Sequence, residues 1–167
     1  MEEEKVLLEA VLCFPVRANS VLLARKTKKI GVGCWNGYGG GLESGEVSEA
    51  AAVRELAEES GLHASVQDIH KVAIIDFHNT KSDGGMFTCK CHVFLVTRWD
   101  GEPRATDEMA SPTWFDIDNL PYGEMMPADR IWLPPALRGT KIIASAHYGP
   151  WQRALLGDVI VTPVDSF

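Results

Sequence analysis

A chain of 167 residues, 46% of them hydrophobic and 23% charged, has the size and composition of one folded domain, which excludes global disorder. Its formal net charge of −7 excludes broad binding to the backbone of a nucleic acid polymer, since that binding needs a basic surface. No apolar run reaches the roughly 18 residues of a membrane-spanning helix, so we expect no membrane contact.

The first forty residues favour strands and loops. Val, Leu and Phe are concentrated in residues 6–16, which predicts a strand, and residues 20–24 predict a second one. A basic stretch follows at 25–33, and it is either a solvated loop or a surface that attracts anions. The glycine-rich residues 35–41 predict extended or loop structure.

One segment clearly predicts a helix. Residues 48–60 are rich in Ala, Glu and Leu and contain no Pro or Gly. Gly61 follows directly, at the position where helices commonly end in a left-handed residue.

The second half of the chain predicts mostly strands. Residues 72–78 and 86–99 flank Asp83-Gly84-Gly85, whose composition is typical of a hairpin turn. The remaining predicted elements are a strand at 113–117, a short helix at 128–133 that stops before Pro134-Pro135, and strands at 141–148 and 159–164. Mixed strands around one clear helix predict an α+β sandwich, and we expect a single domain spanning residues 1–167.

The predicted helix carries an unusual group of carboxylates. Glu55 and Glu59 are four residues apart and share one helix face, which Glu58 flanks. Near the C-terminal end of a helix these charges oppose the macrodipole, a local cost that a bound divalent cation would offset. Oxygen ligands of this kind suit Mg²⁺, which commonly bridges protein carboxylates and substrate phosphates.

A solvated acidic helix face is the alternative, and Glu-x-x-Glu-Glu alone favours it. The surrounding residues favour the metal site. Arg54 is placed to hold a carboxylate, and glycines at 39, 40, 41 and 45 let the backbone approach cations and phosphates closely.

Residues 40–62 match the Nudix box, G-x5-E-x7-R-E-U-x-E-E-x-G-U, at every specified position, so the chain resembles the Nudix hydrolases. The resemblance implies the Nudix fold, a mixed-sheet α/β/α sandwich. It also implies hydrolysis of a phosphoanhydride bond in a nucleotide with Mg²⁺, for which Mn²⁺ can substitute. The implied metal-binding and catalytic residues are Glu55, Glu58 and Glu59, with the Gly39 carbonyl as a further ligand, Arg54 as an orienting residue and Glu46 as a tether for the loop.

The similarity extends to the MutT-type branch of this family, which acts on oxidised purine nucleoside triphosphates such as 8-oxo-dGTP. It is carried by residues 35–40, Asp107-Glu108-Met109, Trp114-Phe115 and residues 127–132. By this match Asn36 and Asp129 bind the edges of the base, Lys26 faces the sugar or phosphates, and Glu108 is a late metal ligand or base. Two positions that line the substrate site differ: Ile30 replaces a phenylalanine and Met126 replaces a stacking tryptophan. Ala128 also replaces an aspartate, so the base is less well specified than the chemistry.

Several of these residues have ordinary alternatives. Asn36 is also a turn residue, Asp129 a helix N-terminal charge and Glu108 a surface acid. Trp114, Phe115 and Trp132 are more often core than pocket residues.

Two other functions stay open: a Nudix hydrolase of another nucleoside diphosphate derivative, such as a dinucleotide or nucleotide sugar, and a module that binds a nucleotide without cleaving it. The first five residues are acidic and lack the basic region of a secretory signal, so we expect a cytoplasmic protein. We also expect a monomer whose partner is a small nucleotide.

Overall fold

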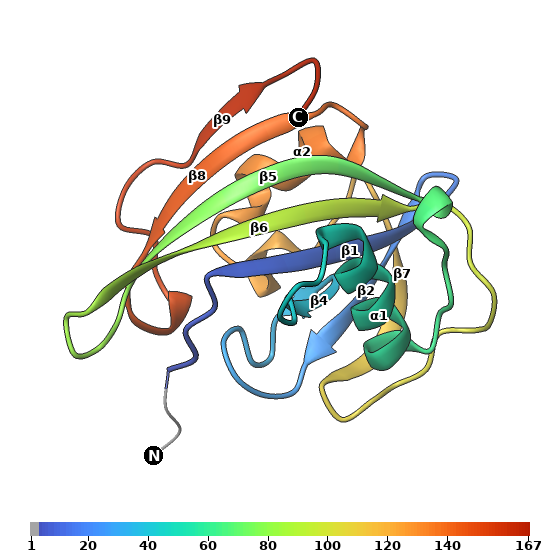
Figure 1. Ribbon diagram of the computed structural model, residues 1–167, viewed down its shortest axis with the longest axis horizontal. Helices are drawn as coiled ribbons and strands as arrows, with labels where there is room; N and C mark the ends of the chain where they lie inside the picture. Colours follow the sequence, from blue (N-terminus) through green and yellow to red (C-terminus); the bar gives the residue numbers. More distant parts are fainter. Residues whose placement is uncertain (1–3) are drawn as a thin grey trace.

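The computed structural model describes residues 4–167, in which nine strands form one sheet (Figure 1). The strands are β1 (Glu9–Arg17), β2 (Ser20–Lys26), β3 (Trp35–Asn36), β4 (Tyr38–Gly41), β5 (Ile69–Thr80), β6 (Met86–Val96), β7 (Met109–Asp116), β8 (Ile142–Tyr148) and β9 (Ile160–Pro163). The helices are α1 (Ser48–Ser60) and α2 (Asp129–Leu137), and the short 3₁₀ turns are η1 (Val66–Asp68), η2 (Tyr122–Glu124) and η3 (Pro150–Gln152).

The sheet is mixed: seven strands follow the order β3-β2-β1-β6-β5-β8-β9, and β7 and β4 lie off this path, with β7 paired to β2. The pairs β1–β6 and β5–β8 are parallel, and the other pairs are antiparallel. β4 pairs with β1, so that Leu12 lies opposite Gly39. This pairing places the glycine-rich strand beside the centre of the sheet.

The sheet is covered on both faces. Val11 and Cys13 of β1 pack into one core with α1, whereas Phe14 packs into a second core with α2. Figure 1 shows α1 in front of β1 and α2 behind the sheet. The alternation of successive β1 side chains between two covered faces confirms the predicted α+β sandwich.

α1 has the predicted bounds. It ends at Gly61, whose backbone is left-handed (φ 78°) and whose N–H donates to the Ala57 carbonyl. Ala51, Ala52 and Leu56 are fully buried against the sheet. These small and apolar residues fix the rotation of the helix about its axis, and thereby which residues turn toward β4.

The predicted end of the second helix, at residue 133, is wrong. α2 continues through Pro134 and Pro135 to Leu137, although neither proline can donate a backbone hydrogen bond. Burial explains the difference, because Leu133, Ala136 and Leu137 all pack against the sheet and stabilise the extra turn.

The four cysteines are free thiols. Among residues 4–167, no helix combines the length and the apolar character that crossing a bilayer requires. Residues 1–3 of the acidic start lie outside the described residues.

Candidate active site

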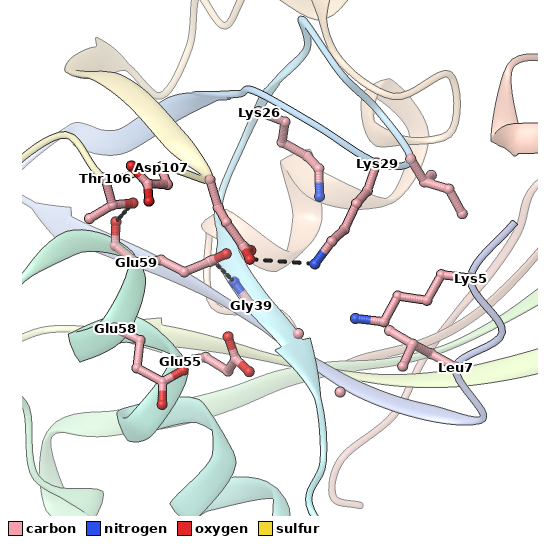
Figure 2. Close-up of a pocket in the computed structure, with 14 residues that line it drawn as sticks. Lys5, Leu7, Lys26, Lys29, Gly39, Glu55, Glu58, Glu59, Thr106 and Asp107 are labelled. Atoms are coloured by element: carbon pink, nitrogen blue, oxygen red, sulfur yellow. Dashed lines mark hydrogen bonds and ion pairs between the residues drawn. The ribbon is translucent and has the colours of Figure 1, made fainter. Parts of the chain in front are cut away.

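A cavity of about 390 Å³ lies between α1, β4 and the loop that precedes β7. Glu55, Glu58 and Glu59 line it from α1, and Glu108 lines it from the loop. Figure 2 shows the three α1 glutamates on one side and the ammonium groups of Lys5, Lys26 and Lys29 across from them. The structure therefore brings together the predicted carboxylates and the predicted lysine, Lys26.

Arg54 holds this acidic surface together. Its Nε and Nη2 donate to the two carboxylate oxygens of Glu46 at 2.9 and 2.8 Å. Its Nη1 donates to Glu55 at 2.9 Å and to Glu58 at 3.3 Å, and Nη2 also reaches the Gly41 carbonyl. The pairing with Arg54 lowers the pKa of Glu46 to about 2. One guanidinium thus fixes the loop, β4 and two of the α1 glutamates relative to one another.

β4 needs glycines because it passes very close to a side chain of α1 and to the backbone of β1. A Cβ atom on Gly40 would lie 2.6 Å from Oε1 of Glu55, and one on Gly39 would lie 1.9 Å from the Val11 carbonyl oxygen. Only glycine lets β4 pass this close to both the carboxylate and the neighbouring strand.

Glu59 is the most buried of the α1 glutamates, with 7% of its surface exposed. Its Oε1 accepts a 2.9 Å hydrogen bond from the Gly39 N–H. Burial raises its pKa, and a hydrogen bond shared with the Glu108 carboxyl raises it further. Two carboxyl groups can share such a bond only through a proton, so this pair is a natural place for a cation.

The basic side of the cavity is close to the acidic side. Lys29 lies 3.4 Å from Glu108. Burial lowers the pKa of Lys26, while the charges of Glu59 and Glu108 oppose that shift. Ammonium groups facing carboxylates across a cavity suit a ligand that carries both negative charge and bound cations.

A second cavity, of about 370 Å³, adjoins the first. Lys29 and Ile30 line both cavities, and Met126 and Cys34 line the second. The predicted substrate-site positions Ile30 and Met126 therefore lie together, on a largely apolar surface next to the charged cavity.

Asn36 and Asp129 are not among the residues that line these two cavities. The Asn36 side chain accepts a hydrogen bond from the Gly37 N–H at 2.8 Å. This contact is the one expected if Asn36 is a turn residue. Asp129 begins α2 and is 4% exposed. One carboxylate oxygen accepts from the Trp132 indole N–H at 3.2 Å, and the other has no hydrogen-bond partner among the described residues, 4–167. Burial raises the pKa of Asp129 to about 7.

The aromatic residues follow the core interpretation. Trp132 is 1% exposed and packs edge-on against Phe14, and Phe115 packs edge-on against Trp35. Trp114 stacks on Trp99. None of these rings is among the residues lining the two cavities.

The donor set fits a hard divalent cation in its chemistry. Among residues 4–167, no three acidic, histidine or cysteine side chains stand close enough to enclose a metal ion. The carboxylates nevertheless line one cavity, and each of these side chains offers only oxygen atoms as metal ligands. Oxygen donors with room left for water and phosphate are what Mg²⁺ prefers.

Some residues around the cavities carried no sequence signal. Lys5 and Leu7, before β1, and Thr106, before β7, line the first cavity. Thr106 also donates to the Glu59 carbonyl at 2.9 Å. Trp151 and Gln152 of η3 line the second cavity. Trp151 and Gln152 lie far from the Nudix box in the sequence, and no sequence pattern links them to the site.

Comparison with known proteins identifies a family and several similar proteins. The NUDIX domain family matches residues 6–135. The oxidized purine nucleoside triphosphate hydrolase of Danio rerio is 39% identical over 132 residues, covering 79% of this chain and 81% of that one. The Mus musculus protein of the same name is 35% identical over 156 residues, covering 93% and 95%. A MutT protein from Bacillus halodurans superimposes with a TM-score of 0.77 over 93% of this chain and 97% of that chain, at 22% identity, and shows the shared fold.

Proposed function

This chain belongs to the Nudix domain family and is a Nudix hydrolase, and from that premise we propose that it hydrolyses a nucleoside triphosphate with Mg²⁺. The products are the nucleoside monophosphate and pyrophosphate, and the preferred substrate is an oxidised purine nucleotide such as 8-oxo-dGTP. Mn²⁺ substitutes for Mg²⁺.

The proposal rests on one observation: opposite charges face each other across a single cavity. Glu55, Glu58 and Glu59 lie opposite Lys5, Lys26 and Lys29 (Figure 2). A polyphosphate with its cations satisfies both sides at once, whereas a neutral ligand satisfies neither.

The residues that would hold Mg²⁺ are Glu55, Glu58, Glu59, Glu108 and the carbonyl of Gly39. A bound Mg²⁺ neutralises phosphate charge and makes a water molecule more acidic. The lysines bind the phosphate oxygens and keep the chain of phosphates extended across the cavity. Glu59 accepts the proton of the attacking water, whose oxygen bonds to phosphorus as the bridging oxygen leaves. Arg54 keeps Glu55 and Glu58 in position throughout.

The preference for an oxidised purine is supported by the relatives and by the second cavity. Both vertebrate relatives carry oxidised purine nucleoside triphosphates in their names. Ile30 and Met126 offer an apolar surface directly beside the phosphate-binding side chains. From the resemblance alone we assign Asn36 and Asp129, which line neither cavity in this structure, to the polar edges of the base. One buried oxygen of the Asp129 carboxyl makes no hydrogen bond within residues 4–167.

Pyrophosphate release from a nucleotide panel tests the proposal. The panel contains 8-oxo-dGTP, dGTP, ADP-ribose and a diadenosine polyphosphate, each with Mg²⁺ and with a chelator. We expect Mg²⁺-dependent release from 8-oxo-dGTP at a kcat/KM well above that for dGTP. Cleavage only of ADP-ribose or the dinucleotide overturns the substrate, and tight binding without turnover overturns the enzymatic role.

The cytoplasmic location, the monomeric state and the single domain over residues 1–167 stay predictions. Size-exclusion chromatography with light scattering tests the monomeric state directly, and a mass near 18 kDa is expected.

A further inference from the structure

The second cavity has a wall that the function described above does not use. Trp151 and Gln152, in η3 near the end of the chain, line this cavity together with Ile30 and Met126. We infer that Trp151 is the aromatic residue on which the base of the nucleotide stacks. The inference rests on the proposed function, because it deepens the substrate class of the same site.

The first support is the position of the cavity. Lys29 and Ile30 line both cavities, so a ligand whose phosphates lie among the lysines extends its base into the second one. A Cβ atom on Gly31 would lie 2.9 Å from Sδ of Met126 and 3.4 Å from the Lys26 side chain. Gly31, in the loop after β2, therefore lies close to both a phosphate-side residue and a base-side residue.

The second support is the composition of the wall. Met126 stands where a stacking tryptophan is expected, and a thioether cannot supply the flat surface of an indole. Trp151 returns an indole to the same cavity from a different part of the chain. Met126 and Trp151 together give one polarisable and one flat apolar surface, which suits the two faces of a purine ring.

The third support is the conformation of η3. Trp151 and Gln152 have left-handed backbones, with φ of 59° and 54°, which non-glycine residues rarely adopt. Such a conformation persists where surrounding contacts hold it, and it recurs at ligand sites. Here Nε2 of Gln152 donates to Oδ1 of Asn79 at 2.7 Å, and Asn79 is 4% exposed. This contact anchors the turn to β5 and places the neighbouring indole at the cavity.

The experiment compares Trp151→Ala, Trp151→Phe and the control Leu156→Ala, which changes an exposed apolar residue of the same loop that does not line the cavity. Steady-state KM and kcat are measured with 8-oxo-dGTP and with an abasic deoxyribose triphosphate. Trp151→Ala is expected to raise KM for 8-oxo-dGTP about tenfold, the loss that one base–aromatic contact carries. It leaves KM for the abasic compound unchanged, and Trp151→Phe restores most of the loss.

An equal rise in KM for both compounds assigns Trp151 a structural role and overturns the inference, and so does the absence of any rise. Calorimetric titration with 8-oxo-dGMP and with deoxyribose 5-phosphate needs no turnover. Purine binding that depends on Trp151 in a protein without hydrolytic activity rejects the proposed function and keeps the inference. If Trp151→Ala does not change the hydrolysis of 8-oxo-dGTP, the inference is rejected and the proposed function is kept. Failure of the unaltered protein to bind 8-oxo-dGMP at all overturns the inference.

Discussion

Arg54 and Glu46 are joined by two parallel hydrogen bonds, of 2.9 Å from Nε and 2.8 Å from Nη2. This forked pair ties the loop before α1 to the helix itself. The third nitrogen, Nη1, is thereby left to face Glu55 and Glu58. A residue that contacts no substrate in the proposed mechanism thus fixes two of the residues that would hold Mg²⁺.

Arg54→Lys tests this relationship. A lysine presents one compact ammonium group and cannot replace a planar fork with five donors. We expect kcat/KM to fall about 10- to 100-fold, as is typical when a residue supporting metal ligands is lost. Arg138→Lys, at a largely exposed arginine, is the matched control and should leave kcat/KM unchanged. An unaltered rate in Arg54→Lys would show that Glu55 and Glu58 do not need this support.

Gly40→Ala tests the close passage of β4 past α1. The new Cβ atom would lie 2.6 Å from Oε1 of Glu55, so the carboxylate must move. Displacing a reacting group by about 1 Å can cost about 100-fold in rate, and we expect kcat to fall by ~10–100-fold. Gly85→Ala is the comparison, because there the nearest atom belongs to the exposed Asp83 side chain, which can turn away. Equal kcat values for the two variants would contradict the proposed position of Glu55.

Asp129→Asn tests the buried carboxyl at the start of α2 through the pH dependence of stability. Burial raises the pKa of Asp129 from 3.8 to about 7 in the folded protein. Below pH 4 both states hold the proton, so the carboxyl has no effect. Between pH 4 and 7 only the unfolded chain releases it, so the free energy of unfolding falls as pH rises. Above pH 7 the loss is complete.

The asparagine variant does not titrate there. The difference in unfolding free energy between the two proteins should therefore change by up to about 4 kcal/mol from pH 4 to pH 7.5, in favour of the variant. Urea unfolding at several pH values measures it, and groups common to both proteins cancel. A difference that stays constant with pH would place the Asp129 carboxyl in a solvated environment.

The sequence predicts those parts of the fold and site whose causes are local. α1 has its predicted bounds because residues 48–60 contain no helix breaker and Gly61 supplies the left-handed end. Glu55 and Glu59 share a helix face by spacing alone, and the fixed offsets of the box place Arg54 and the glycines around them.

What the sequence does not predict depends on contacts between distant segments. α2 runs through Pro134 and Pro135 because burial against the sheet outweighs the lost hydrogen bonds. The local sequence around the two prolines does not predict that burial. Lys5 and Trp151 reach the cavities from the two ends of the chain. The positions of Lys5 and Trp151 follow from the course of β1 and β8 through the sheet, and no local sequence motif predicts that course.

The measurement that tests the central claim most directly is Mg²⁺-dependent pyrophosphate release by the unaltered protein and by Glu59→Gln, with 8-oxo-dGTP as substrate. Glutamine keeps the size of the side chain and can still accept the Gly39 hydrogen bond, but it cannot take a proton from water. We expect kcat to fall by ~10²–10⁴, the range for losing a positioned base, while the melting temperature stays close to that of the unaltered protein. A loss smaller than about fivefold in a well-folded variant would contradict the role given to Glu59.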